Sequence, residues 1–307
     1  MKIVITGALG HIGSYLIRHL PDFFEMPHIV MIDNLSTQRY TSLFYLPKHA
    51  TYEFIEADVI TTDLTPFFEK ADIVIHLAAI TNAAASFEHA DEVERVNLTA
   101  TQKVASACVK NNVMMIMASS TSVYGTQENI IDENCAPEEL KPQSPYAKTK
   151  LLEETFVQNL CEKNKLRAII FRFGTIFGVS PGMRFHTAVN KFCWQAVMQQ
   201  PLTVWSTAYH QKRPYLALSD ATAAIVLMIQ RNQFDGKVYN VVTNNITVSE
   251  VVETIKKYVP NLTVNFVDNQ IMNQLSYEVL NTRLQSLGFK PTGNFQIGIS
   301  DTMHLFR

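Results

Sequence analysis

Short apolar runs alternate with longer stretches of helical periodicity through the first half of the chain. Several of these runs are apolar throughout and rich in β-branched residues, which is typical of strands buried on both faces of a parallel sheet. The expected strands are Lys2–Thr6, His28–Asp33, Tyr52–Glu56, Ile73–Leu77, Val113–Ser119 and Arg167–Phe173. The expected helices between them are Ile12–Leu20, Glu92–Lys110 and Pro145–Lys163. This alternation predicts an α/β fold with a doubly wound parallel sheet and right-handed crossovers.

The rhythm changes after residue 178. Residues 179–213 carry Pro181, Gly182 and Pro201, and they predict a loop-rich insertion that holds one helix, Thr187–Gln199. A strand–helix–strand pattern then returns at Tyr215–Leu218, Ala221–Gln230 and Val238–Val242. The tail predicts a helix from about Val248 capped by Thr247 or Ser249, a strand near Leu262–Phe266 and a helix ending at Leu287-Gly288. We therefore expect a large domain of residues 1–178 plus 214–243, and a smaller, discontinuous domain of residues 179–213 and 244–307.

Composition narrows the class of protein. The chain has 307 residues, which is the length of about two domains. Apolar residues make up 47% and charged residues 18%, a balance that favours packed domains over disorder. The formal net charge is −2, so the basic excess that nucleic acids and anionic membranes attract is missing. We expect neither a nucleic-acid partner nor a membrane partner.

The sequence also shows no targeting signal and no cysteine spacing typical of disulfide-rich or zinc-binding proteins. The first apolar run enters Thr6-Gly7 after three residues, whereas a signal peptide needs roughly 7–15 apolar residues. No stretch offers the ~20 apolar residues of a membrane span. The four cysteines (Cys108, Cys135, Cys161 and Cys193) are far apart and form no Cys-x-x-Cys pair. We expect reduced thiols, no metal site and a cytoplasmic location.

A glycine-rich segment directly follows the first expected strand. It reads Thr6-Gly7-Ala8-Leu9-Gly10-His11-Ile12-Gly13, so the glycines have the spacing Gly-x-x-Gly-x-x-Gly. A turn of this kind lets the backbone approach a pyrophosphate, which then lies on free N–H groups at the positive end of a helix dipole. A plain glycine-rich turn would give the same letters, but the position between a strand and a helix indicates dinucleotide binding.

Two aspartates follow the next strands of the predicted sheet. Asp33 closes the second strand, 20 residues after Gly13, where a carboxylate can accept hydrogen bonds from the adenosine ribose hydroxyls. It would repel a 2′-phosphate, so it favours NAD over NADP. Asp58 lies just past the third strand, where it can accept from the adenine amino group. The alternatives are a helix cap at the strand end for Asp33 and a turn aspartate for Asp58.

Tyr146 and Lys150 form a Tyr-x-x-x-Lys pair at the start of an expected helix, after Pro145. Side chains four residues apart share one face, so the phenol and the ammonium can enter the same cleft. A free tyrosine has a pKa of ~10, and its use near pH 7 requires roughly 4 kcal/mol of preferential phenolate stabilisation. A neighbouring lysine and a positive nicotinamide ring can supply such a field. By itself the pair could equally be an exposed amphipathic one.

Hydroxyl side chains gather where the fifth strand ends, in the run from Ser119 to Gly125. Ligands of doubly wound sheets bind at this carboxyl edge, where Ser119, Ser120 or Thr121 can hydrogen-bond an alcohol or a carbonyl. A Ser/Thr turn that merely closes the strand would have the same composition.

Taken together, these segments resemble an extended short-chain dehydrogenase/reductase, specifically the NAD-dependent nucleotide-sugar epimerase/dehydratase family, over nearly the whole chain. Further segments that carry the resemblance are Asp33-Asn34-Leu35-Ser36, His76-Leu77-Ala78-Ala79, Asn97, Val123-Tyr124-Gly125, Arg172 through Gly178, and Arg213-Pro214-Tyr215 leading to Asp220. The resemblance implies a Rossmann-type NAD-binding domain, a nucleotide-sugar substrate domain and a Ser/Thr–Tyr–Lys catalytic set.

The resemblance also implies roles for single residues. Ser120 matches the catalytic hydroxyl, Tyr146 the base that takes the proton of the sugar 4-hydroxyl, and Lys150 the group that holds the nicotinamide ribose. The positions that match NAD contacts are Gly7, Gly10, His11, Ile12, Gly13, Asp33, Asn34, Asp58, Val59, Leu77, Ala78, Ala79, Asn97, Ser119, Tyr146, Lys150, Phe173 and Ile176. The expected substrate contacts are Thr81, Asn82, Ser120, Thr175, Arg184, His186, Asn190, Lys191 and Arg213.

Among the substrate contacts, Arg213 matches an arginine that pairs with the nucleotide diphosphate, which suits a bidentate guanidinium. For Arg184 and Lys191 the alternative is a solvated surface charge. Trp205 follows an apolar run where the family places a wall for the nucleobase, whereas Trp194 is expected to pack in the core.

Three departures from the family pattern bear on the reaction. Dehydratases of the family carry an acid between the catalytic hydroxyl and Val-Tyr-Gly, and this chain has Thr121 and Ser122 there, so 4,6-dehydration lacks its general acid. The family's Arg-Tyr-Phe-Asn segment reads Arg172-Phe173-Gly174-Thr175. A second diphosphate arginine expected near residue 275 is replaced by Gln274-Leu275-Ser276-Tyr277.

These features lead us to expect redox chemistry at the fourth carbon of a nucleotide-diphosphate sugar. The leading interpretation is a 4-epimerase in the synthesis of bacterial surface-polysaccharide precursors. A net 4-dehydrogenase or a 4-keto-sugar reductase would use the same residues, and a 4,6-dehydratase or a non-catalytic NAD-binding protein remains as a further alternative. The helices at Glu92–Lys110 and Pro145–Lys163 match those that pair into a homodimer in the family.

Overall fold

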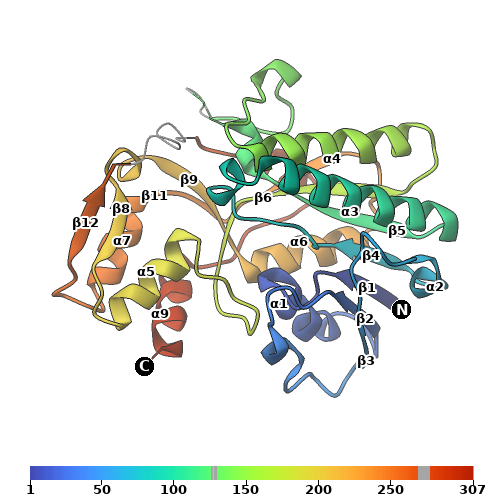
Figure 1. The fold of residues 1–307 in the computed structure, drawn as a ribbon, viewed down its shortest axis with the longest axis horizontal. Coiled ribbons are helices and arrows are strands. Elements are labelled where there is room, and N and C mark those ends of the chain that lie inside the picture. Colours follow the sequence, from blue (N-terminus) through green and yellow to red (C-terminus); the bar gives the residue numbers. More distant parts are fainter. Residues whose placement is uncertain (126, 128–129, 269–276, 307) are drawn as a thin grey trace.

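A seven-stranded parallel sheet forms the centre of the computed structural model, which describes residues 1–125, 127, 130–268 and 277–306 (Figure 1). The strand order is β10-β6-β5-β4-β1-β2-β3. Its strands are β1 (Lys2–Thr6), β2 (His28–Asp33), β3 (Thr51–Glu56), β4 (Ile73–His76), β5 (Met114–Ser120), β6 (Ala168–Phe173) and β10 (Val238–Val241). All neighbours in the sheet run parallel. The expected doubly wound α/β sheet is confirmed.

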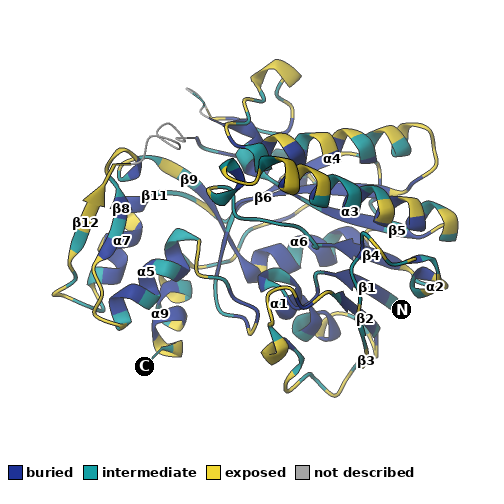
Figure 2. Ribbon diagram, in the orientation of Figure 1, coloured by how far each residue is buried: buried dark blue, intermediate teal, exposed yellow. Residues whose placement is uncertain are grey.

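Helices cover both faces of this sheet, as the alternation along β1 requires. Ile3 and Ile5 point into a core shared with α1 (His11–His19) and α6 (Leu218–Gln230). Val4 points to the opposite core, which it shares with α3 (Ala90–Asn111) and α4 (Pro145–Glu162). The short α2 (Thr65–Phe68) packs beside α3. Figure 2 shows the sheet buried between these layers, with exposed residues on the outer faces of α3 and α4.

The boundaries of α3 and α4 follow from local chemistry. α4 begins at Pro145, and the Ser144 side chain accepts a hydrogen bond from the Ala147 amide at 3.1 Å, a standard N-cap. α3 ends at Asn111 and is capped by Asn112, whose φ of 54° is the left-handed conformation that terminates helices. The N-cap therefore places Tyr146 in the first turn of α4, at the edge of the sheet.

Smaller sheets and the remaining helices form the other end of the molecule, on the left of Figure 1. One sheet has the order β11-β9-β7 and consists of β7 (Thr175–Phe177), β9 (Lys212–Ala217) and β11 (Asn244–Thr247). The other pairs β8 (Leu202–Trp205) with β12 (Val264–Val267). The helices at this end are α5 (Ala188–Val197), α7 (Val248–Lys256) and α9 (Phe295–Leu305). Their apolar faces share one core with β8 and β9. The short α8 (Thr282–Ser286) instead packs against β10 of the main sheet.

Most expected elements of the second half are present, with differences in the short strands. The strand expected at Tyr215–Leu218 begins earlier, at Lys212, and pairs with β7 and β11. Thr247 rather than Ser249 caps α7, because its side chain accepts from the Glu250 amide in a capping box. The strands β7, β8 and β11 and the helix α9 were not predicted. The division into the two expected domains remains a prediction.

Two further findings concern membranes and thiols. Across the described ranges, no helix has both the length and the apolar character needed to cross a bilayer. All four cysteines are free thiols; Cys108 and Cys193 are buried, and burial raises the pKa of Cys193 to about 12.

Candidate active site

A single cavity of about 510 Å³ lies along the carboxyl ends of the parallel strands. This edge of a doubly wound sheet is where ligands bind. Its lining brings together the glycine-rich turn, the ends of β2, β4, β5 and β6, the first turn of α4, the segment 184–191 and parts of β8 and β9. Every site residue expected from the sequence lines this cavity except Asn97 and Asn190.

The glycine-rich turn has the geometry that a dinucleotide needs. Gly7 has a φ of +68°, and a Cβ there would lie 2.7 Å from the Ala78 amide nitrogen. A Cβ on Gly13 would lie 2.6 Å from the carbonyl oxygens of Gly7 and Ala8, so the start of α1 closes tightly on the turn. Side chains at these two positions would break the turn, whereas glycine leaves the N–H groups at the helix start open to a phosphate. The residues present therefore fit NAD.

Asp33 is anchored by the backbone around it. Its Oδ2 accepts from the Leu9 amide and its Oδ1 from the Leu35 amide, both at 3.0 Å. The carboxylate is half-buried on the cavity wall, and its remaining lone pairs can accept from two ribose hydroxyls. Asp58 is held in a similar way, with Oδ2 accepting from Asn34 Nδ2 at 3.0 Å.

Sequence reasoning missed Arg39, which also lines the adenosine end of the cavity. Burial lowers the pKa of Arg39, and the nearby Asp33 carboxylate opposes that effect. The arginine lies six residues after Asp33, just beyond the Asp33-Asn34-Leu35-Ser36 segment that carries the family resemblance. Arg39 and Asp33 thus place opposite charges on the cavity wall around the expected ribose site.

His11 joins the glycine-rich turn to the segment after β7. Its Nε2–H donates to the Gly178 carbonyl at 2.8 Å, and its own carbonyl accepts from Ser180 Oγ at 2.9 Å. Burial lowers the pKa of His11 to about 3, so the imidazole is neutral near pH 7. The Gly182 amide donates to Ser14 Oγ at 2.9 Å, which adds a second contact between the same segments. The start of the segment 179–187 is therefore hydrogen-bonded to residues at and just after the glycine-rich turn.

Tyr146 and Lys150 lie one turn apart on α4, as the spacing predicts. Lys150 Nζ lies 5.8 Å from the centre of the Tyr146 ring and donates to the Ala118 carbonyl at 3.1 Å. The lysine is 4% exposed and pairs with Glu153 Oε2 at 3.0 Å. Burial acts to lower the pKa of Lys150, but Glu153, Tyr146 and Glu154 together outweigh it and the pKa is raised. The ammonium therefore stays charged next to the phenol.

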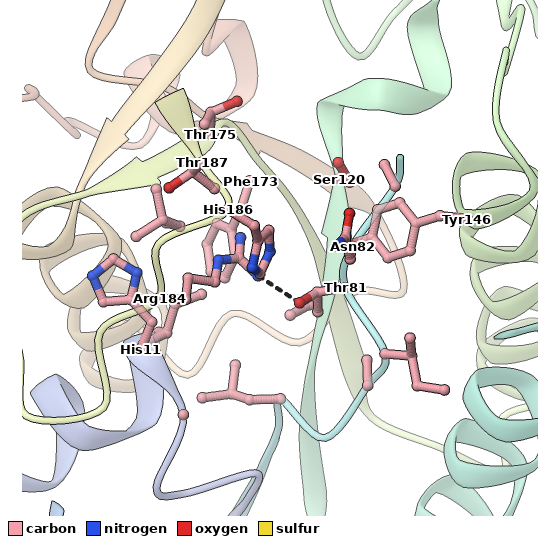
Figure 3. Close-up of a pocket in the computed structure, with 18 of the residues that line it drawn as sticks. His11, Thr81, Asn82, Ser120, Tyr146, Phe173, Thr175, Arg184, His186 and Thr187 are labelled. Carbon is pink, nitrogen blue, oxygen red and sulfur yellow. Dashed lines mark hydrogen bonds between the residues drawn. The ribbon is translucent and has the colours of Figure 1, made fainter. Parts of the chain in front are cut away.

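The two serines at the end of β5 have different surroundings. Ser119 Oγ donates to Glu154, which forms a buried two-point ion pair with Arg172 at 3.0 and 2.7 Å. Ser120 Oγ instead accepts from Ser122 Oγ at 2.9 Å and keeps its own proton for another partner. Figure 3 shows Ser120 on the same side of the cavity as Tyr146. Of the two hydroxyls, Ser120 is the one free to bond a substrate.

Arginines provide the positive charge on the other side of the cavity. Arg184 Nη1 donates to Thr81 Oγ1 at 2.6 Å, as the dashed line in Figure 3 shows. Burial lowers the pKa of Arg184. The Tyr146 phenol acts to raise this pKa, and the positive charge of Arg39 acts to lower it. Within the described residues, Arg184 Nε and Arg213 Nη2 are buried and have no hydrogen-bond partner. Buried donors without partners point to an anionic ligand.

Asn97 and Asn190 support the site from behind. Asn97 is fully buried and bonds both backbone groups of Ile80, its Oδ1 accepting at 2.8 Å and its Nδ2 donating at 2.9 Å. Asn190 Nδ2 donates to the Arg184 carbonyl at 3.0 Å. Neither asparagine lines the cavity, but each holds a residue that does, Ile80 for Asn97 and Arg184 for Asn190. Gln274, Leu275 and Ser276 lie outside the described residues, whereas Tyr277 is described and lines the cavity.

Metal chemistry has no visible support in this cavity. Across residues 1–125, 127, 130–268 and 277–306, no group of three or more His, Cys, Asp or Glu side chains is placed to hold a metal ion.

Comparison with known proteins places this site in a family. The model of the NAD dependent epimerase/dehydratase family matches residues 3–242. An uncharacterized UDP-glucose epimerase, YtcB, of Bacillus subtilis (strain 168) is 30% identical over 78% of this chain and 76% of its own length. The dTDP-D-glucose 4,6-dehydratase of Bos taurus is 25% identical over 100% of this chain and 88% of its own. 

A solved structure agrees with these sequence relatives. The UDP-glucuronic acid 4-epimerase from Bacillus cereus, in complex with UDP-glucuronic acid and NAD, superimposes with a TM-score of 0.88 and 25% identity, covering 100% of this chain and 99% of that one. The expected resemblance and the expected cofactor, NAD, are confirmed. The chain belongs to the NAD dependent epimerase/dehydratase family of nucleotide-sugar enzymes.

Proposed function

We propose that this enzyme is a 4-epimerase of a nucleotide-diphosphate sugar. The observation that carries the proposal is the hydroxyl–phenol–ammonium set of Ser120, Tyr146 and Lys150 at one cavity, without an acid at residues 121 and 122. Thr121 is buried and donates its hydroxyl to the Phe173 carbonyl at 3.3 Å, so it turns away from the acid–base role. Relatives of both kinds exist, 4-epimerases and 4,6-dehydratases, and this feature favours the former.

The residues divide the acid–base work in a simple way. Tyr146, as phenolate, accepts the proton of the sugar 4-hydroxyl, and the Lys150 ammonium stabilises the phenolate. Ser120 Oγ donates to the same sugar oxygen and fixes its position. NAD, when bound, supplies the reversible acceptor for hydride. Epimerisation then requires the oxidised sugar to present the opposite face of C4 to the hydride, while the C4 oxygen stays within reach of Tyr146, which returns the proton.

Charge on the opposite wall supports a diphosphate substrate. Arg213 and Lys191 line the cavity, and Arg213 Nη2 has no partner among the described side chains. Guanidinium groups bind phosphate through two parallel hydrogen bonds, which orients the nucleotide as well as holding it. The sugar would then lie between these cations and Tyr146.

Three broader expectations belong to this proposal. We assign the substrate to bacterial surface-polysaccharide precursors, the enzyme to the cytoplasm, and the assembly to a homodimer formed through α3 and α4. These helices pack against each other along one face of the sheet, and their outer faces carry exposed residues (Figure 2).

The test is a panel of UDP-, GDP-, dTDP- and CDP-sugars that includes UDP-glucose and UDP-glucuronic acid, followed by NMR of the anomeric protons. We expect a second set of sugar signals at constant NADH absorbance, and a loss of about 10²–10⁴ in rate for Tyr146→Phe. Net formation or consumption of NADH would instead identify a 4-dehydrogenase or a keto-sugar reductase. Turnover unchanged in Tyr146→Phe, or no turnover with any sugar, would remove the proposal.

A further inference from the structure

Lys150 has a buried counterion that the proposed chemistry does not use. Glu153 is 1% exposed, and its Oε2 lies 3.0 Å from Lys150 Nζ. A buried carboxylate is costly unless it is paired and hydrogen-bonded. The other oxygen, Oε1, is buried and has no hydrogen-bond partner among the described residues. The single oxygen Oε2 therefore carries the interactions that hold this charge.

A chain of side chains leads from Glu153 to the strand that precedes the glycine-rich turn. Thr101 Oγ1 donates to Glu153 Oε2 at 2.7 Å, and the same hydroxyl lies 3.2 Å from His76 Nε2. His76 Nδ1 lies 2.7 Å from Thr6 Oγ1. These four residues come from α4, α3, β4 and β1, and all of them are buried.

The direction of each hydrogen bond in this chain follows from counting protons. The Thr101 hydroxyl has one hydrogen, which it gives to Glu153, so it must accept from His76 Nε2–H. Burial lowers the pKa of His76 to about 3, so the ring is neutral and carries only that one proton. His76 Nδ1 is then an acceptor, and the Thr6 hydroxyl donates to it. Every donor in the chain points towards Glu153.

Such an alignment stabilises negative charge at its end, because each dipole presents its positive side to the carboxylate. Among the neighbouring groups, Lys150 is the cation that pairs with the Glu153 carboxylate. Glu154 turns to Ser119 and Arg172, and His76 is neutral. Tyr146 and, more weakly, Glu154 are the other groups that act on the lysine. The ammonium next to the phenol is thus paired with a buried anion, Glu153.

We propose that Glu153 is a positioning residue that acts on Tyr146 through Lys150, holding the ammonium in place and setting the pH at which the phenol gives up its proton. This inference rests on the proposed role of Tyr146. The negative charge of Glu153 stabilises the fully protonated Tyr146–Lys150 pair. Replacing it with a neutral amide removes an anion that disfavours the phenolate, so the phenol loses its proton at a lower pH. At an effective dielectric constant of about 20, a unit charge about 10 Å away changes this pH by on the order of one unit.

The experiment is a pH titration of tyrosinate absorbance in NAD-loaded protein. Each titration is corrected by its Tyr146→Phe counterpart, so that only the ring of Tyr146 is read. The variants are Glu153→Gln, which removes the charge, and Glu153→Asp, which keeps it. Glu162→Gln is the matched control, because it removes an exposed carboxylate from the end of the same helix.

We expect the Tyr146 signal of Glu153→Gln to appear about one pH unit lower, with Glu153→Asp and Glu162→Gln at the wild-type position. The acid limb of the kcat profile should move in the same direction. A signal that stays in place in Glu153→Gln, or moves equally in Glu162→Gln, would overturn the inference. Because the titration needs no turnover, a shift without sugar conversion would remove the proposed function alone, and conversion without a shift would remove the inference alone. If Glu153→Gln does not fold, the Thr101 variants provide the test. A Tyr146 titration that is displaced from the wild-type pH in Thr101→Val, but not in Thr101→Ser, supports the inference. Wild-type titrations of Tyr146 in both variants contradict it.

Discussion

Arg184 reaches across the cavity to Thr81, with its Nη1 2.6 Å from the threonine hydroxyl (Figure 3). The contact joins the segment after β7 to the segment after β4, and both residues are expected substrate contacts. Arg184 Nε is buried and has no hydrogen-bond partner among the described residues, and Arg184 lines the cavity.

Replacing Arg184 should therefore weaken substrate binding more than it affects folding. A hydrogen bond to a charged group contributes about 1.5–3 kcal/mol, so Arg184→Gln should raise KM for the sugar nucleotide by about 10- to 100-fold. Steady-state kinetics measure this effect, and the exposed Arg231→Gln is the matched control. An unchanged KM would show that Arg184 makes no contact with the substrate.

Asp33 should decide between NAD and NADP. Asp33→Asn keeps an acceptor for the Leu9 or Leu35 amide but removes the charge that repels a 2′-phosphate, and Arg39 lies next to it. We expect the preference for NAD over NADP to fall by about tenfold, which corresponds to ~1.4 kcal/mol. Fluorescence titration with both cofactors measures the ratio. Glu56→Gln, on the neighbouring strand end, serves as the control for charge alone.

How much of this could be read from the sequence differs between the two halves of the chain. β1 and β2 were predicted to the residue, because buried parallel strands are apolar on both faces and end at polar turns. β7, β8 and β11 have three or four residues each, too few for a period to show, and their pairing partners are distant in sequence.

The site shows the same division. The glycine turn, Asp33, Tyr146 and Lys150 are local motifs, so their spacing was sufficient to place them. The Glu153–Thr101–His76–Thr6 chain joins four separate elements, and only the fold brings those side chains together. Asn97 and Asn190 were expected at the ligand but lie behind the cavity lining, a distinction that depends on packing.

Thr101 should matter for stability. Thr101→Val leaves His76 Nε2–H without an acceptor and removes one donor from Glu153, and a buried unsatisfied group costs about 1–3 kcal/mol. Thr101→Ser keeps the hydroxyl and should lose only the packing of a methyl group, about 1 kcal/mol. Urea unfolding of both variants gives the comparison. Equal losses of unfolding free energy in Thr101→Val and Thr101→Ser would show that packing, and not the hydroxyl, determines the contribution of Thr101 to stability.

Two buried histidines should make folding depend on pH. Burial lowers the pKa of both His11 and His76 to about 3, below the ~6.5 of an unfolded histidine. The unfolded chain therefore binds more protons than the folded one between about pH 6.5 and 3. Their contribution is complete above about pH 6.5 and is lost as the pH falls, by about 1.4 kcal/mol per pH unit for each histidine.

His76→Gln isolates one of these contributions. The amide can donate to Thr101 and accept from Thr6, so it can keep the hydrogen-bond directions without a titrating ring. The free energy of unfolding should be measured in urea between about pH 4.5 and 6.5, which is the two units below the pKa of a free histidine. Its slope against pH should be smaller in the variant by the equivalent of about one proton bound on unfolding. An identical slope in both proteins would mean that His76 binds no additional proton on unfolding.

The account as a whole depends on oxidation and reduction at one sugar carbon, with Tyr146 moving the proton. The most direct test is turnover of the accepted nucleotide sugar in D₂O, with NMR of the product carbon by carbon. We predict inversion at C4 with no deuterium at C4 or C5, because hydride returns within the site and no acid at residues 121 and 122 serves elimination. Deuterium at C5 together with loss of water, or a C4 ketone with net NADH formation, would contradict a 4-epimerase.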